Sequence, residues 1–329
     1  MMKLTGVWLA ASFVLAAASA EAADKVRFGT NWLAEAEHGG YYQAVADGTY
    51  AKYGLDVEIV QGGPQAANGI LLVSGKLDFY MGSSLIEAFD AAKQKAPMVV
   101  VAAHMQKDPQ MVMSHPGVGL DKFTDLVNSP AYIAKGAPFY EWMVSAYGFK
   151  EENVKPYTFN PQPFIADKKS IQQGYVTSEP YAIEKVGKFK PNIFLFADLG
   201  FSSYATTVET RPDLVAKKPD LVQRFVDASI EGWYNYLYGD NKAANDLIKK
   251  DNPEITDGQI AFSIEKMKEY GIVESGEALD KGIGCMTDAK YKKFFDTMVG
   301  IKVFKPDTDY KKAFTTQFVC KGTGMGLKK

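Results

Sequence analysis

The chain has 329 residues and a formal net charge of −2 at pH 7, because 37 Lys and Arg residues are balanced by 39 Asp and Glu residues. With neither a basic excess nor a basic run, this charge excludes a nucleic-acid-binding protein. The two cysteines, Cys285 and Cys320, are too few for a multi-cysteine metal cluster. In an oxidising compartment they either pair or stay free, and the sequence leaves both open.

Residues 1–23 are predicted to be a signal peptide that is removed on export. Lys3 precedes an apolar run, Val7 to Ala18, that is too short to span a bilayer, and small residues between Ala18 and Ala22 offer a cleavage site. No cysteine lies at the cleavage point, so we expect a soluble periplasmic protein rather than a lipid-anchored one.

Three predicted strands near the N-terminus are each followed by a loop and a helix. The strand at 26–29 leads into the aromatic loop 31–42, the strand at 56–60 into Gln61-Gly62-Gly63, and the strand at 77–81 into Gly82-Ser83-Ser84. In a parallel sheet the carboxyl ends of the strands share one edge, which is where open α/β sheets bind ligands. We therefore expect the three loops to meet at one crevice.

A second α/β unit is predicted to follow, and helical patterns then continue to the C-terminus. The remaining chain is long enough for two lobes with separate cores. If the helical part packs on the first unit, the chain crosses between lobes near Gln110 and near Gly200. This predicts a first lobe of residues 24–112 plus 201–329 and a second lobe of residues 113–200.

Several stretches together resemble a known family. Gly48 through Val57, the turn at 74–78 and the stretch 206–222 are similar to periplasmic solute-binding proteins of nitrate, sulfonate and taurine ABC importers. Asn31-Trp32 followed by Glu37-His38-Gly39-Gly40-Tyr41 most resembles the branch that binds thiamine pyrimidine precursors, which is related to fungal hydroxymethylpyrimidine synthase.

The resemblance implies an α/β fold of the type II periplasmic-binding-protein kind. Each of two lobes would be a mixed sheet flanked by helices, with two hinge crossings and the ligand held between the lobes. It further implies a monomer without a cofactor that delivers a small molecule to the membrane permease of an ABC transporter.

A planar nitrogen heterocycle needs aromatic faces to stack on and a polar partner at its edge. Glu179 is the predicted edge partner, because a carboxylate accepts from an amino group and from a protonated ring nitrogen. The same glutamate also fits an ordinary first-turn residue that is favoured by the helix dipole. The predicted ligand-binding residues are Asn31, Trp32, Glu37, His38, Tyr41, Gly62, Ser83, Tyr132, Phe159, Asn160, Glu179 and Tyr204.

Two other functions remain open. A sulfonate, nitrate or flavin would be the ligand of a related binding protein, although the chain has only three arginines to hold an oxyanion. A pyrimidine-precursor synthase would be an enzyme, but that branch has closely spaced cysteines and is cytosolic. We expect no enzyme and no metal site, because no G-x-S-x-G motif is present and the three histidines lack metal-ligand spacing. His104 and His115 are expected at the surface or in a hinge.

Overall fold

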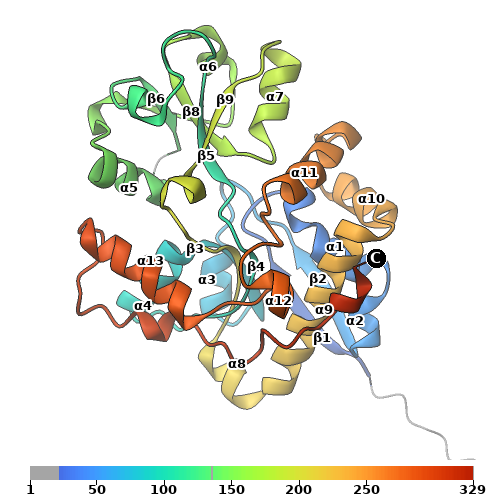
Figure 1. Cartoon of the computed structure of the whole chain (residues 1–329). Helices are drawn as coiled ribbons and strands as arrows, with labels where there is room; N and C mark the ends of the chain where they lie inside the picture. The colour runs from blue at the N-terminus through green and yellow to red at the C-terminus, as the bar shows by residue number, and fades with distance from the viewer. Residues whose placement is uncertain (1–21, 135, 329) are drawn as a thin grey trace, which may run out of the picture.

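The computed structural model describes residues 22–134 and 136–328, and in it the chain forms two five-stranded sheets flanked by helices (Figure 1). Nearly all of the predicted signal peptide, residues 1–23, therefore lies outside the described residues. Within the described part, no helix combines the length and the apolar character that crossing a membrane requires.

The first sheet has the strand order β2-β1-β3-β10-β4. β1 is parallel to β2 and β3, whereas β10 is antiparallel to β3 and β4. The predicted parallel arrangement of the first three strands is therefore confirmed, and their carboxyl ends share one edge. The strands are β1 (Asp24–Gly29), β2 (Leu55–Val60), β3 (Phe79–Ser84), β4 (Val99–Met105) and β10 (Ala205–Thr210).

The second sheet has the order β7-β6-β8-β5-β9. β6 is parallel to β7 and β8, and β5 is antiparallel to β8 and β9. Both sheets are therefore mixed, as predicted. The strands are β5 (Gln110–Ser114), β6 (Ala131–Ile133), β7 (Val154–Pro156), β8 (Ile171–Tyr175) and β9 (Asn192–Leu195).

The chain passes between the sheets twice, at residues 106–109 and at residues 200–204. Residues 110–112, which the sequence analysis assigns to the first lobe, belong to β5 and pair within the second sheet. The apolar run through these residues does not itself reveal which sheet it joins. From the sheets we propose a first lobe of residues 24–105 plus 205–328 and a second lobe of residues 110–199.

Most helices pack on the first sheet, and the predicted long helices of the C-terminal part are present as α9, α10, α11 and α13 (Figure 1). On the first lobe lie η1 (Ala36–His38), α1 (Gly39–Ala46), α2 (Thr49–Lys52), α3 (Asn68–Val73), α4 (Leu85–Lys93), α8 (Pro212–Lys217), α9 (Pro219–Tyr238), α10 (Lys242–Asp251), α11 (Asp257–Glu269), α12 (Ala278–Lys281), α13 (Asp288–Gly300), η5 (Tyr310–Ala313) and η6 (Met325–Leu327). On the second lobe lie η2 (Phe123–Leu126), α5 (Pro138–Tyr147), η3 (Glu151–Asn153), α6 (Gln162–Ala166), α7 (Glu179–Val186) and η4 (Phe196–Leu199).

Glycines allow α1 and α9 to pack closely against each other. A Cβ atom on Gly39 would lie 2.0 Å from the ring of Tyr236, and one on Gly40 would lie 2.3 Å from the ring of Trp233. A Cβ atom on Gly232 of α9 would in turn lie 2.2 Å from the carbonyl oxygen of Gly40. The Gly39-Gly40 pair therefore serves the contact between two helices of the first lobe.

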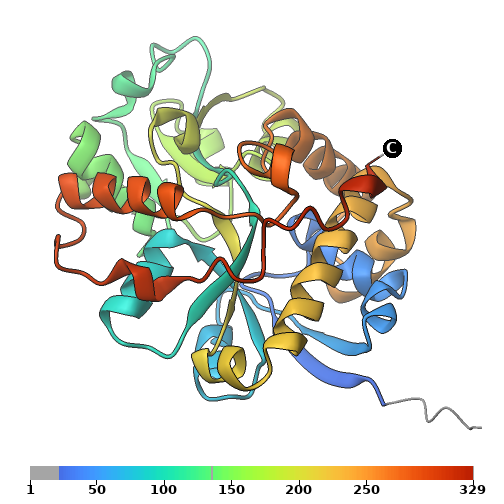
Figure 2. The same cartoon turned by 60° about the horizontal axis from the view of Figure 1, so that its bottom comes forward.

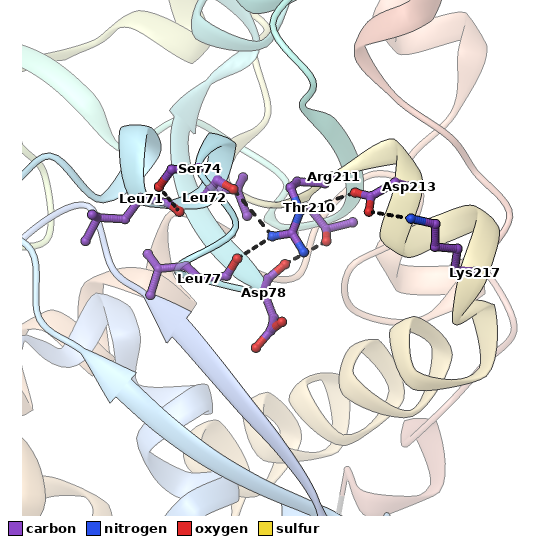
Figure 3. A network of polar contacts seen from close by, with 9 residues as sticks. All are labelled: Leu71, Leu72, Ser74, Leu77, Asp78, Thr210, Arg211, Asp213 and Lys217. Atoms are coloured by element: carbon purple, nitrogen blue, oxygen red, sulfur yellow. Dashed lines mark hydrogen bonds and ion pairs between the residues drawn. The ribbon is translucent and has the colours of Figure 1, made fainter.

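Arg211 joins the end of β10 to the turn between α3 and β3 (Figure 3). Its guanidinium donates to the carbonyl oxygens of Leu72 and Leu77, and its Nε lies 3.2 Å from an oxygen of Asp213. The other two arginines also hold the first lobe together. Arg27 pairs with a carboxylate on β2, and Arg224 pairs with one at the start of β1.

Cys285 and Cys320 form a disulfide, which settles the alternative that the sequence left open. The bond joins the segment before α13 to the final segment, which runs back across the first lobe and ends beside α9 (Figure 2). The two cysteines are 35 residues apart, and closing a loop of this length stabilises a fold by about 3 to 4 kcal/mol on the chain-entropy estimate. A structural disulfide is typical of an exported protein.

Candidate functional site

A cavity of ≈ 270 Å³ lies between the two sheets. The loop after β1 and the end of β3 line it from the first lobe, the N-termini of α5 and α7 line it from the second, and both crossings contribute. Larger hollows exist at the surface, and one of ≈ 600 Å³ also has residues of both lobes, but the ≈ 270 Å³ cavity includes residues of both crossings as well. Its lining residues are Asn31, Trp32, Glu35, Ser83, Ser84, Asp108, Gln110, Ala137, Pro138, Phe139, Phe159, Gln173, Gly174, Tyr175, Ser178, Glu179 and Phe201.

Glu179 is the first residue of α7 and lines the cavity. Its Oε2 accepts a hydrogen bond of 2.7 Å from the backbone N–H of Tyr175. This fold-back requires a glycine at position 174, because a Cβ atom there would lie 2.7 Å from the Cβ of Glu179. Burial raises the pKa of the Glu179 carboxyl to about 7. Glu179 is therefore a first-turn glutamate and a cavity wall at once, which combines the two interpretations of the sequence.

Two further carboxyls, Glu35 and Asp108, line the same cavity. Burial raises the pKa of Glu35 well above its ordinary value, and the neighbouring charges of Glu37 and Glu179 raise it further. Asp108 lies in the first crossing, where its Oδ1 accepts from the backbone N–H of Gln110 at 2.9 Å, and burial raises its pKa to about 7. The site therefore concentrates acidic groups that resist ionisation, and the described residues that line it carry no cationic side chain.

The described residues that line this cavity include no Lys, Arg or His. His38 Nε2 lies 3.7 Å from an oxygen of Glu35, but burial lowers the pKa of His38 to about 3, so the ring is neutral at pH 7. All three arginines are engaged within the first lobe. Lys135, which follows β6 in the sequence, lies outside the described residues.

Two aromatic rings close one side of the cavity from opposite lobes. Trp32 follows β1 and Phe159 precedes α6, and their ring centroids lie 4.6 Å apart at an interplanar angle of 52°. Phe159 has a backbone φ of 63°, a left-handed conformation that aromatic residues rarely adopt. Such strain is often found where a side chain is positioned for function. Both rings are placed to contact a flat solute.

Of the twelve residues predicted to bind a ligand, the structure brings five to this cavity, namely Asn31, Trp32, Ser83, Phe159 and Glu179. Glu37 instead lines a smaller neighbouring cavity. His38 is buried, and Tyr41 lies in the core, where its hydroxyl is 2.8 Å from Nδ1 of His104. The cluster of rings read from the sequence thus belongs largely to the packing of α1 on the first sheet.

The other four predicted residues also lie away from the cavity. Gly62 packs under the loop after β1, where a Cβ atom would lie 2.4 Å from a backbone carbonyl oxygen. Tyr132 lies in β6 and packs on the core of the second lobe. Asn160 is exposed and caps the turn before α6, and the buried Tyr204 hydroxyl accepts from the N–H of Thr287. Sequence spacing alone did not distinguish these structural roles from a ligand contact.

The most informative residues that sequence reasoning missed are Glu35 and Asp108. Each follows the end of a strand of the first sheet, at the edge where ligands bind, and that position was the available signal. His104 and His115 were expected at the surface or in a hinge. They are 0% and 5% exposed, so the expectation of a surface position is wrong, and His104 lies in β4 next to the first crossing.

The family of the chain is shown by its sequence. The sequence model of the family described as NMT1/THI5 like matches residues 35–244. The chain belongs to the NMT1/THI5-like family. This confirms the resemblance found in the sequence.

Relatives of this NMT1/THI5-like chain are named for different functions. The riboflavin-binding protein RibY of Chloroflexus aurantiacus is 23% identical over 91% of this chain and 87% of its own length. The aliphatic sulphonate binding protein SsuA of Escherichia coli matches with a TM-score of 0.66 at 12% identity, over 88% of this chain and 91% of SsuA. The desulfurization enzyme DSZB matches with a TM-score of 0.58 at 10% identity, over 90% of this chain and 97% of DSZB. The likeness to these structures shows a periplasmic-binding-protein fold.

Proposed function

We propose that this protein is the periplasmic solute-binding component of an ABC importer and captures a small planar nitrogen heterocycle between its lobes. The observation that carries the proposal is the cavity wall, where three carboxyls meet two aromatic rings and the described lining residues include no cationic side chain. An aminopyrimidine supplies what this wall lacks, since its amino group donates to a carboxylate and its ring stacks on Trp32 or Phe159.

The size of the cavity supports a ligand with one or two rings. At ≈ 270 Å³ it lies near the lower end of the range for ligand sites, about 300 to 1,000 Å³. A solute of the thiamine pyrimidine precursor class matches this single cavity, whereas a flavin would also need the adjoining cavity of ≈ 200 Å³. RibY is named for riboflavin, so riboflavin is the competitor to test first.

An oxyanion is a poorer match, although SsuA is named for sulphonates. A sulfonate or nitrate would lie beside Glu35, Asp108 and Glu179, whose ionised forms would repel it.

The transport role depends on export and on a membrane partner. The disulfide supports an oxidising compartment, and the predicted signal peptide would direct the chain there. The partner would be the permease of the importer, which receives the solute when the lobes separate.

The experiment is to identify what copurifies. The chain is produced with its leader in a bacterial periplasm, purified without denaturation, and extracted for mass spectrometry. We expect a nitrogen heterocycle, which after addition to fresh protein is recovered unchanged. A sulfonate or riboflavin as the copurifying molecule would contradict the ligand class, and conversion of the heterocycle into a product would contradict the binding role.

A further inference from the structure

A second cavity of ≈ 200 Å³ adjoins the first. Glu35 and Ser178 line both cavities, so the two meet at these residues. Because the wall comes from η1, α11 and the N-terminal end of α7, the second cavity also lies between the lobes. Its lining residues are Glu35, Glu37, Ser178, Asn252, Glu254, Ile255, Gln259 and Ser263.

Glu37 is the central group of this second cavity. The residue is only 1% exposed, and its Oε1 has no hydrogen-bond partner among the described residues. No described Lys, Arg or His lies within ion-pair distance of its carboxylate. Leaving a buried carboxylate oxygen without a partner is costly. The side chain of Thr177 lowers the pKa of Glu37, and further donors from an occupant would stabilise its ionised form.

The neighbouring polar side chains already use their donors on backbone carbonyls. The amide of Asn252 donates to Ala34, that of Gln259 donates to Ser178, and the hydroxyl of Ser263 donates to Thr177 at 2.7 Å. The amide oxygens of Asn252 and Gln259 accept no hydrogen bond within the described chain. The free oxygens left to face an occupant therefore outnumber the free donors, which are the second N–H of Asn252 and the hydroxyl of Ser178.

Helix α11 closes this cavity against the second lobe (Figure 1). Gln259 and Ser263 lie on α11 and bond to the residues immediately before α7, and the rings of Tyr181 and Phe262 lie 5.6 Å apart across the same contact. An occupant would therefore be enclosed by both lobes, as a ligand in the first cavity would be.

We propose that the second cavity is a subsite for a protonated amino group, carried on a short arm of the solute whose ring occupies the first cavity. This rests on the proposed function. An ammonium has three donors and no acceptor, which is the complement of a wall of free oxygens around a buried carboxylate. Burial raises the pKa of Glu37 to about 7 and the charge of Glu179 adds to this, so a bound ammonium would restore the ionised form.

The test compares arms on one ring by calorimetry with the full mature chain. The probes are 4-amino-2-methylpyrimidine without an arm, with hydroxyalkyl arms and with aminoalkyl arms of one to three carbons, together with riboflavin. We expect at least one amino arm to bind at least tenfold more tightly than the hydroxyl arm of equal length. This comparison uses the unmodified protein and does not depend on the folding of a variant.

A Glu37→Gln variant locates the effect. The tenfold advantage should disappear, and the ring without an arm should lose less affinity than the amino-arm probe does. Glu265→Gln, on the exposed side of α11, is the matched control and should leave both affinities unchanged.

Four outcomes would overturn the subsite. Equal affinity for amino and hydroxyl arms, or an advantage that survives Glu37→Gln, contradicts it while leaving the proposed function intact. Tighter binding of riboflavin than of any amino arm would assign the second cavity to a polyol chain instead. Failure of the pyrimidine without an arm to bind contradicts the proposed function itself, and the subsite with it.

Discussion

Carboxylates serve one purpose in the structural framework of the first lobe and another in the cavity between the lobes, which is called the cleft below. In the framework of the first lobe they have arginine partners, with Arg224 Nη2 at 2.7 Å from Asp24 and Arg211 Nε at 3.2 Å from Asp213. In the cleft Glu35, Asp108 and Glu179 face a cavity whose described wall has no cation. The difference teaches that the first lobe pairs its structural carboxylates with its own arginines. The carboxyls that line the cavity have no cationic partner among the described lining residues and are left for a solute.

The comparison predicts that framework changes lower stability and that cleft changes lower affinity. Removing the disulfide should have the largest effect of all. A Cys285→Ser/Cys320→Ser double variant should lose about 3 to 4 kcal/mol of unfolding free energy, because the unfolded chain regains the freedom that the bond removes. Urea denaturation measures this loss, and affinity for the solute should stay unchanged. A loss of affinity as large as the loss of stability would contradict the prediction that framework changes lower stability and leave affinity unchanged.

Glu179→Gln tests the cleft. The amide can still accept from the N–H of Tyr175, so the start of α7 is kept, but the charge-assisted hydrogen bond to the solute is lost. We expect affinity for an aminopyrimidine to fall by about 1.5 to 3 kcal/mol, roughly 10- to 150-fold, measured by calorimetry. Glu184→Gln, exposed on the same helix, is the control.

In this experiment a sulfonate should bind better to Glu179→Gln than to the unmodified protein, because one repulsive charge is gone. Lys135 lies outside the described residues. Lys135→Ala is therefore measured in parallel, so that a contribution of this lysine to sulfonate binding is seen separately. Retention of full pyrimidine affinity by Glu179→Gln would show that the carboxylate is only a helix-capping group.

Arg211→Met tests the framework at the site drawn in Figure 3. The change leaves the carbonyls of Leu72 and Leu77 without their donor, which should cost about 1 to 3 kcal/mol of unfolding free energy. Arg27→Met, whose ion pair is exposed, should cost about 1 kcal/mol or less. Neither variant should change affinity, and a shift in the dissociation constant with Arg211→Met would contradict the account.

The smallest predicted effect is the change of unfolding free energy with each pH unit. Burial raises the pKa of Glu37, Asp108 and Glu179 to about 7, so below that pH the folded protein binds more protons than the unfolded one. This stabilisation is fully present below the ordinary carboxyl pKa and is lost as pH rises through 7. The slope is at most about 1.4 kcal/mol per pH unit for each carboxyl.

Urea titrations of the unliganded protein between pH 5 and 8 measure this slope. Glu179→Gln should flatten it, because one titrating carboxyl is removed. Affinity for a cationic solute should change in the opposite direction and increase as the carboxyls ionise. Unfolding free energy that increases from pH 5 to pH 8 would contradict the raised pKa values.

The sequence predicted the elements that depend on local pattern. The three parallel N-terminal strands, the mixed sheets and the long C-terminal helices follow from periodicity and were found. The site was predicted less well, because residues such as Tyr41 and Tyr204 have the right type and position but are buried by packing partners far away in the chain. The contact of Gly39 with Tyr236 shows why, since nothing near Gly39 in the sequence indicates that a ring will lie against it.

The most direct test of the account measures which charge the protein prefers in its solute. Calorimetric titration of the mature, unmodified protein at pH 7 with 4-amino-5-hydroxymethyl-2-methylpyrimidine and, separately, with ethanesulfonate compares an N–H donor with an anion of small size. The account predicts saturable binding of the pyrimidine and none of the sulfonate. Saturable binding of ethanesulfonate without binding of the pyrimidine would contradict it.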